Sequence, residues 1–216
     1  MKIRVLAVAF VLAAAASAST VTISFTGLPQ YQANGYYVGN TKATVGDSPF
    51  DLLCADFTST TYVPSGPFTF SVSALPSLTN VRFTGADTLT KYETAAILLY
   101  TLDGLERTSS YAVGSYQYAI WKLFTPSVGD YGDSAALLAS AQTTVANGGM
   151  QTAYDALRVF TPTQGSASNQ EFLAIDYTNR ISAPPNAAAV PEQSTFLQLG
   201  SGLLLLAGAF KRWRQS

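Results

Sequence analysis

The spacing of the apolar residues changes twice along this chain, and these changes constrain the fold more than any other feature. From Val21 to Val72, apolar residues alternate with polar ones or form short β-branched and aromatic runs, separated by Gly, Pro, Asn and Asp. Such runs predict about four strands in the first part of the chain and two closing strands near its end. The expected strands are Val21–Phe25, Tyr36–Val38, Phe50–Phe57, Phe68–Val72, Arg158–Phe160 and Glu171–Tyr177.

Between these two strand-rich parts the spacing of apolar residues is helical. A first helix is expected from Thr90 to Leu102, because Thr90 and Glu93 have the spacing of a capping box. A second is expected over Ser110–Phe124, and a third over Asp133–Ala146 with Asp133 as its N-cap. The order of elements predicts an α+β fold, with a β-strand-rich N-terminal half, an inserted helical subdomain and closing C-terminal strands.

The composition indicates one globular domain with targeting segments at both ends. The 216 residues are 48% hydrophobic and only 12% charged, about half the usual charged share. We expect a signal peptide over 1–18, an exported α+β domain over 19–182, a linker with a sorting motif over 183–195, and a short transmembrane helix with a basic tail over 196–216. The part of the chain between the end segments has seven basic and 13 acidic residues, a net charge of −6. This charge disfavours nucleic acid as a partner.

The N-terminal segment has the three parts of a secretory signal. Lys2 and Arg4 precede an apolar run from Val5 to Ala16, and Ala16-Ser17-Ala18 forms a small-residue cleavage site. The apolar run is short for a membrane span, so we expect cleavage after Ala18; an uncleaved N-terminal helix is the alternative.

The C-terminal segment predicts a membrane anchor. The 15 apolar residues from Phe196 to Phe210 span about 22 Å as a helix, less than the roughly 30 Å of a bilayer core. The basic residues Lys211, Arg212 and Arg214 follow, and basic flanks stay cytoplasmic, so the domain is expected to face outward. A buried C-terminal helix of the domain is the alternative.

This C-terminal arrangement resembles the PEP-CTERM sorting signal of exported bacterial proteins. The resemblance covers about the last 27 residues and rests on Val190, Pro191 and Glu192, the Gly-Ser-Gly-Leu helix and the basic tail; Gln193 departs from the proline of the family. It implies recognition by an exosortase-type processing enzyme and a place in the cell envelope or extracellular matrix, often together with exopolysaccharide.

Two absences limit the chemistry available to the domain. The chain has no histidine, which removes the usual base for serine or cysteine nucleophiles and the commonest metal ligand. Asp130 and Asp133 do not have the spacing of a calcium loop. We therefore expect no enzymatic activity, no metal and no cofactor.

Two residues stand out against their apolar surroundings. The second predicted helix places Val113, Gln117, Trp121 and Phe124 on one face, which is apolar except for Gln117. A buried amide without a partner costs about 1–3 kcal/mol, so Gln117 must be hydrogen-bonded, lie at an opening or have reacted. Cys54, the one cysteine of the chain, lies in a run typical of a buried strand.

Leu53-Cys54 and the run from Gln117 to Trp121 (Gln-Tyr-Ala-Ile-Trp) resemble the two halves of the thioester domains of Gram-positive surface adhesins. In that family the cysteine sulfur joins the side-chain carbonyl of the glutamine, ammonia is lost, and an amine of a partner can attack the thioester. The resemblance implies a cross-link between Cys54 and Gln117 and covalent adhesion to amine-bearing partners. Tyr116 departs from the threonine usual before the glutamine.

The residues leave two interpretations of this pair open. In one, Cys54 and Gln117 form the thioester, which by analogy with a disulfide would remove about 4 kcal/mol of unfolded-chain entropy. In the other, Cys54 is a core thiol and Gln117 a hydrogen-bonded core amide. The domain would then be a non-covalent structural or exopolysaccharide-associated envelope protein.

Overall fold

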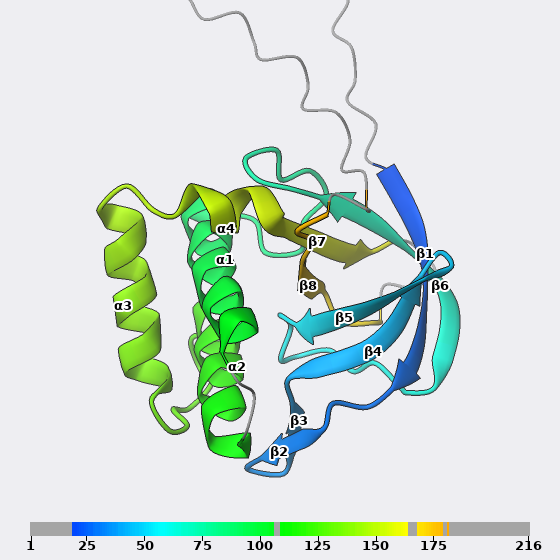
Figure 1. The fold of residues 1–216 in the computed structure, drawn as a ribbon, viewed down its shortest axis with the longest axis horizontal. Coiled ribbons are helices and arrows are strands. Elements are labelled where there is room, and N and C mark those ends of the chain that lie inside the picture. Colours follow the sequence, from blue (N-terminus) through cyan, green and yellow to red (C-terminus); the bar gives the residue numbers. More distant parts are fainter. Residues whose placement is uncertain (1–18, 106–108, 164–167, 179–180, 182–216) are drawn as a thin grey trace, which may run out of the picture.

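The computed structural model describes residues 19–105, 109–163, 168–178 and 181, and it combines an antiparallel β-barrel with a helical layer (Figure 1). Six strands close the barrel in the order β1-β4-β5-β8-β7-β6, with β6 pairing back to β1. The strands are β1 (Ser19–Gly27), β4 (Asn40–Val45), β5 (Ser48–Cys54), β6 (Ser65–Ser73), β7 (Leu157–Pro162) and β8 (Phe172–Ile175).

The barrel is filled by aromatic side chains from strands that are distant in sequence. Phe25 of β1, Phe70 of β6 and Phe172 of β8 are buried, and their ring centroids lie 5.0–6.3 Å apart. Rings at such distances add to the hydrophobic stabilisation that their burial already provides. The short closing strands β7 and β8 therefore complete the core that the N-terminal strands begin.

Four helices follow the first six strands and lie on one side of the barrel (Figure 1). Their bounds are α1 (Thr88–Gly104), α2 (Ser110–Phe124), α3 (Ser134–Ala146) and α4 (Gln151–Ala156). α1 packs on β8, and α2 packs on a separate hairpin of β2 (Tyr31–Ala33) and β3 (Tyr36–Val38). α3 forms the outer layer, where only Ser134 and Ala141 of its residues are buried.

The structure confirms the coarse prediction of mixed helix and strand, with a strand-rich N-terminal half followed by helices. Some boundaries were wrong. The capping box at Thr90 does not exist, because α1 begins two residues earlier, after Asp87. Strand β5 ends at Cys54 and does not continue to Phe57. Asp133 precedes α3 as predicted but makes no side-chain capping bond.

The helix α2 has the predicted bounds, and Ser109 caps it by accepting a hydrogen bond from the backbone N–H of Ala112. Its buried surface is wider than the single apolar face that was expected. Ser115, Tyr116 and Tyr118 are buried as well, because α3 and the β2–β3 hairpin cover the other sides of the helix.

Several predictions concern segments outside the described residues. These are the signal peptide over 1–18, the linker over 183–195, and the helix and tail over 196–216, together with Val190, Pro191, Glu192, Lys211, Arg212 and Arg214. In the described part of the chain, no helix combines the length and apolar character needed to cross a membrane.

Candidate functional site

Cys54 is the last residue of β5 and lies where the barrel meets the helical layer. Its backbone pairs with Phe172 of β8, and the next residue, Ala55, donates to the carbonyl of Glu171. The side chain is buried, and its thiol donates to the backbone carbonyl of Asp56 at 3.1 Å. The strand end thus fixes the position of the sulfur.

Gln117, in the middle of α2, is 1% exposed and is held by hydrogen bonds at both ends of its amide. Its Nε2 donates to the backbone carbonyl of Cys54 at 2.7 Å, and its Oε1 accepts from the backbone N–H of Gly39 at 3.3 Å. One partner is an acceptor and the other a donor, so the amide has one favourable orientation. The amide that the sequence marked as anomalous therefore lies against the one cysteine.

Gly39 links β3 to β4 and is required by its surroundings. Its φ of +94° disfavours any residue with a Cβ, and an added Cβ would lie 2.8 Å from Cγ1 of Val113 on α2. Only glycine lets the backbone approach α2 closely enough for its N–H to reach Gln117. Gly39 was not among the predicted site residues, although a glycine directly after a predicted strand was a usable signal.

Cys54 and Gln117 line one cavity of about 230 Å³. Within the described part of the chain its lining contains no charged residue. Leu28, Tyr36 and Tyr37 lie on its lining and are about half exposed, so the cavity opens beside the β2–β3 hairpin. The space far exceeds the ~10–15 Å³ that one water needs and can admit a slender aliphatic group.

Aromatic rings form the wall of this cavity next to the cysteine. The indole of Trp121 contacts the rings of Tyr36, Phe57 and Tyr118, with centroids 6.1, 5.1 and 5.2 Å away. Trp121 is 4% exposed, and its indole N–H has no hydrogen-bond partner among the described residues. A buried donor without an acceptor costs about 1–3 kcal/mol, so this N–H requires an explanation.

The surroundings of Cys54 keep its thiol protonated. Burial raises the pKa of Cys54 to about 12, while the nearby Trp121 side chain lowers it and the charge of Asp56 raises it further. Very little thiolate exists near neutral pH, which is unlike the low pKa of a cysteine prepared for nucleophilic hydrolysis. The site therefore suits a buried acyl group better than a free catalytic thiolate.

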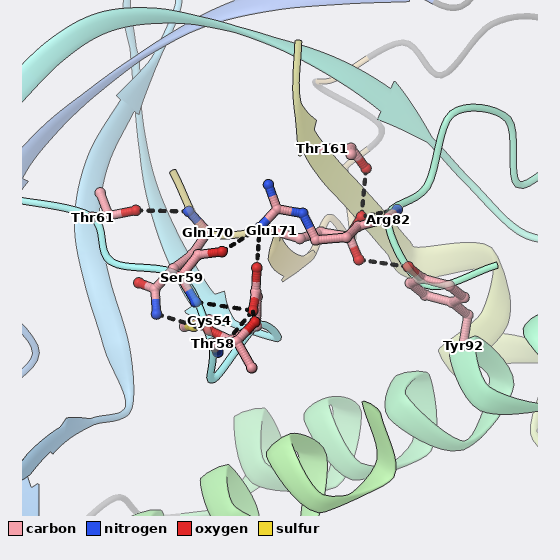
Figure 2. A network of polar contacts seen from close by, with 10 residues as sticks. Cys54, Thr58, Ser59, Thr61, Arg82, Tyr92, Thr161, Gln170 and Glu171 are labelled. Atoms are coloured by element: carbon pink, nitrogen blue, oxygen red, sulfur yellow. Dashed lines mark hydrogen bonds and ion pairs between the residues drawn. The ribbon is translucent and has the colours of Figure 1, made fainter. Parts of the chain in front are cut away.

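A network of buried carboxylates lies next to the cysteine and was not predicted (Figure 2). Asp56 is fully buried and forms an ion pair with Arg82. Burial alone would raise the pKa of Asp56, but hydrogen bonds from Ser59, Thr58 and Arg82 outweigh it and hold that pKa below its usual value. The sequence offered only the spacing of Asp56 from Cys54, because Arg82 lies in an irregular segment.

Glu171 forms the second half of the same network. Its carboxylate accepts from the Tyr92 hydroxyl at 2.5 Å, the Thr161 hydroxyl at 2.6 Å and the Arg82 backbone N–H at 2.7 Å (Figure 2). Burial nevertheless raises the pKa of Glu171 above its usual range. Since each oxygen has partners and the side chain is fully buried, the group joins β7, β8 and α1 as a structural element.

The other carboxylates that the sequence drew attention to lie elsewhere. Asp130 forms an ion pair with Lys122 at 2.5 Å, and Asp133 lies at the start of α3. Over the described residues, no three His, Cys, Asp or Glu side chains gather in a way that could hold a metal ion.

Comparison of this chain with protein-family models, with curated proteins and with solved structures finds no match. The function of the site must therefore be inferred from its geometry and chemistry.

Proposed function

We propose that this chain is an exported surface or matrix protein in which Cys54 and Gln117 form an internal thioester for covalent attachment to an amine-bearing partner. The observation that carries the proposal is the 2.7 Å hydrogen bond between Nε2 of Gln117 and the backbone carbonyl of Cys54, inside a cavity that both residues line. Thioester formation would remove Nε2 of Gln117, and this nitrogen is the atom that is hydrogen-bonded to Cys54.

The bond-forming step balances without a cofactor. The sulfur of Cys54 attacks the side-chain carbonyl carbon of Gln117, the new C–S bond replaces the C–N bond, and the thiol proton leaves with the nitrogen as ammonia. The carbonyl oxygen keeps its acceptor role toward the N–H of Gly39. The product is a buried electrophile, and the uncharged cavity lining lets a neutral amine reach it.

Intact-mass spectrometry of the purified chain tests this proposal. We expect a mass lower by one ammonia than the sequence requires, and methylamine should add to Gln117 while freeing one thiol. Cys54→Ala and Gln117→Ala should each show full mass and no methylamine addition. A wild-type protein of full mass, with Cys54 titrated by thiol reagents after denaturation and without methylamine, would contradict the proposal.

A second candidate function is non-covalent binding of a polysaccharide, and the exposed tyrosines favour it. Tyr36 and Tyr37 are 49% and 47% exposed on the lining of the cavity, beside the side chains of Ser59, Thr60 and Thr61. Exposed aromatic faces can stack on sugar rings while the hydroxyl groups bond to them. Retained binding of neutral oligosaccharides by the Cys54→Ala variant, lost in Tyr36→Ala, would support this function over the first.

A further inference from the structure

Opening of the thioester, which rests on the proposed function, places a specific demand on the sulfur of Cys54. When a neutral amine attacks the acyl carbon of Gln117, a C–N bond forms and the C–S bond breaks. The sulfur leaves with the bonding electron pair, and the proton lost by the amine ends on it as the thiol. Burial makes a thiolate at this position costly, since it raises the pKa of Cys54 to about 12.

Two N–H donors of this site are already occupied by other acceptors. The N–H of Gly39 donates to Oε1 of Gln117, and Nε2 of Gln170 donates to the backbone carbonyl of Asp56. The same carbonyl accepts from the thiol of Cys54 and cannot donate. These groups hold the acyl carbonyl and the backbone in place, and none of these hydrogen bonds is donated to the sulfur.

Trp121 supplies the missing donor. It lies one helical turn after Gln117 on α2 and lines the same cavity as Cys54. Its indole N–H is buried and has no hydrogen-bond partner in the described part of the chain. The indole is also close enough to the sulfur to lower the pKa of the Cys54 thiol. The three ring contacts with Tyr36, Phe57 and Tyr118 hold the indole in this position.

We propose that Trp121 is the leaving-group donor of this site: its indole N–H hydrogen-bonds the sulfur of Cys54 as negative charge develops during attack by an amine. The backbone N–H of Gly39 acts on the other atom that gains charge, the carbonyl oxygen of Gln117. Each atom that gains negative charge thus has its own N–H donor, and both donors are in position before the amine binds.

Trp121→Phe in the full chain removes the N–H and keeps an aromatic ring. We expect the mass deficit to persist, while the rate of methylamine addition falls by about 10- to 100-fold, as for the loss of a hydrogen bond to a charged group. After methylamine has opened the bond, the pH midpoint for alkylation of Cys54 by iodoacetamide should be higher in the variant. A purely structural role would instead lower that midpoint, because looser packing admits water to the sulfur and weakens the effect of burial on its pKa.

Phe83→Leu is the matched control, because Phe83 stacks on Phe124 of the same helix α2 but does not line the cavity and carries no donor. Its rate of methylamine addition should stay within a few-fold of wild type. If Trp121→Phe fails to fold, β-(benzothiophen-3-yl)alanine can replace tryptophan throughout the chain. Trp213 is the other tryptophan, so a Trp213→Phe background confines the replacement to position 121. The analogue keeps the bicyclic shape and has a sulfur atom in place of the N–H. The same slower rate and higher midpoint are expected.

The outcomes separate this inference from the proposed function. Full mass of the wild-type chain overturns the proposed thioester, and the leaving-group role falls with it. A wild-type mass deficit together with an unchanged rate and an unchanged alkylation midpoint in Trp121→Phe and in the analogue overturns the role of Trp121 alone.

Discussion

Gln117 and Cys54 are joined across 63 residues by a 2.7 Å hydrogen bond from the side-chain Nε2 to the backbone carbonyl. The bond links the middle of α2 to the end of β5, so it ties the helical layer to the barrel. The N–H of Gly39 holds the other end of the amide. This relationship determines what a substitution at Gln117 does to stability as long as the amide is intact.

Gln117→Glu replaces the donor end of this amide by a second acceptor. The new oxygen would face the carbonyl of Cys54 in a buried site, so the carboxyl must stay protonated or the bond is lost. In a Cys54→Ala background, where no thioester can form and the backbone carbonyl remains, we expect a loss of about 1–3 kcal/mol in the free energy of unfolding, measured by urea denaturation. Gln32→Glu, on the exposed side of β2, is the control and should change it by less than about 0.5 kcal/mol. Equal effects at both positions would argue against a buried amide.

The sequence predicted those elements whose signals are local. α2 has clear boundaries, because Ser109 can cap its start and Pro126 follows its end, and the helical spacing between them is unambiguous. The polar gap at Gln117 was visible for the same reason. The strand β4 was missed because its buried positions hold the small side chains of Thr41, Ala43 and Val45, which do not produce a strong alternating pattern.

Features that depend on long-range pairing could not be predicted. The barrel closes through β1 with β6 and through β5 with β8, and no local pattern specifies which strands pair. The backbone N–H of Gly39 and the ion pair of Asp56 with Arg82 belong to this class as well. Their partners are set by tertiary packing, and the residue types alone do not identify them.

Gly39→Ala should destabilise the protein through both backbone strain and a clash. The φ of +94° is unfavourable for alanine, and the new Cβ would lie 2.8 Å from Cγ1 of Val113. Gly35→Ala is a close control, because Gly35 has a φ of +83° and open space around the new Cβ. We expect a loss of about 1–2 kcal/mol at Gly35 from strain alone and a larger loss at Gly39, measured by thermal unfolding. Equal losses would show that the close approach to α2 is unimportant.

Arg82→Ala should be among the most damaging single changes, because it leaves the fully buried carboxylate of Asp56 without its ion pair. Breaking such a pair costs about 3–5 kcal/mol, whereas Lys42→Ala at the exposed ion pair with Asp51 should cost at most about 1 kcal/mol. Chemical denaturation of both variants at neutral pH provides the comparison. Similar small effects would mean that Asp56 is well solvated.

The pH dependence of the Arg82→Ala effect follows from the lowered pKa of Asp56. The folded-state pKa of Asp56 lies below its ordinary value of 3.8, so the carboxylate contributes its full stabilisation above pH 3.8. This contribution is lost as the pH falls through the folded-state pKa. The difference between wild type and Arg82→Ala should therefore be full at neutral pH and shrink at acidic pH, as Asp56 takes up a proton. Urea denaturation across acidic pH values measures it, and a difference that grows on acidification would contradict the assignment.

The free thiol of Cys54 should make stability fall at alkaline pH. With a pKa of about 12 in the folded state and 9.0 as its ordinary value, the thiol contributes fully below pH 9. Between pH 9 and 12 the unfolded chain loses the proton and the folded chain keeps it, so the contribution declines by about 1.4 kcal/mol per pH unit.

Gln117→Ala keeps Cys54 as a free thiol, and Cys54→Ala/Gln117→Ala is its matched control without the sulfur. Subtracting the free energies of unfolding of the two variants removes the contribution of the tyrosines, several of which also have raised pKa values and titrate at alkaline pH. The difference should be constant up to about pH 9 and then decline. A constant difference up to pH 11 would show that the sulfur reaches solvent in the unbonded form, and the site would then lack the water-excluding environment that a stored thioester needs.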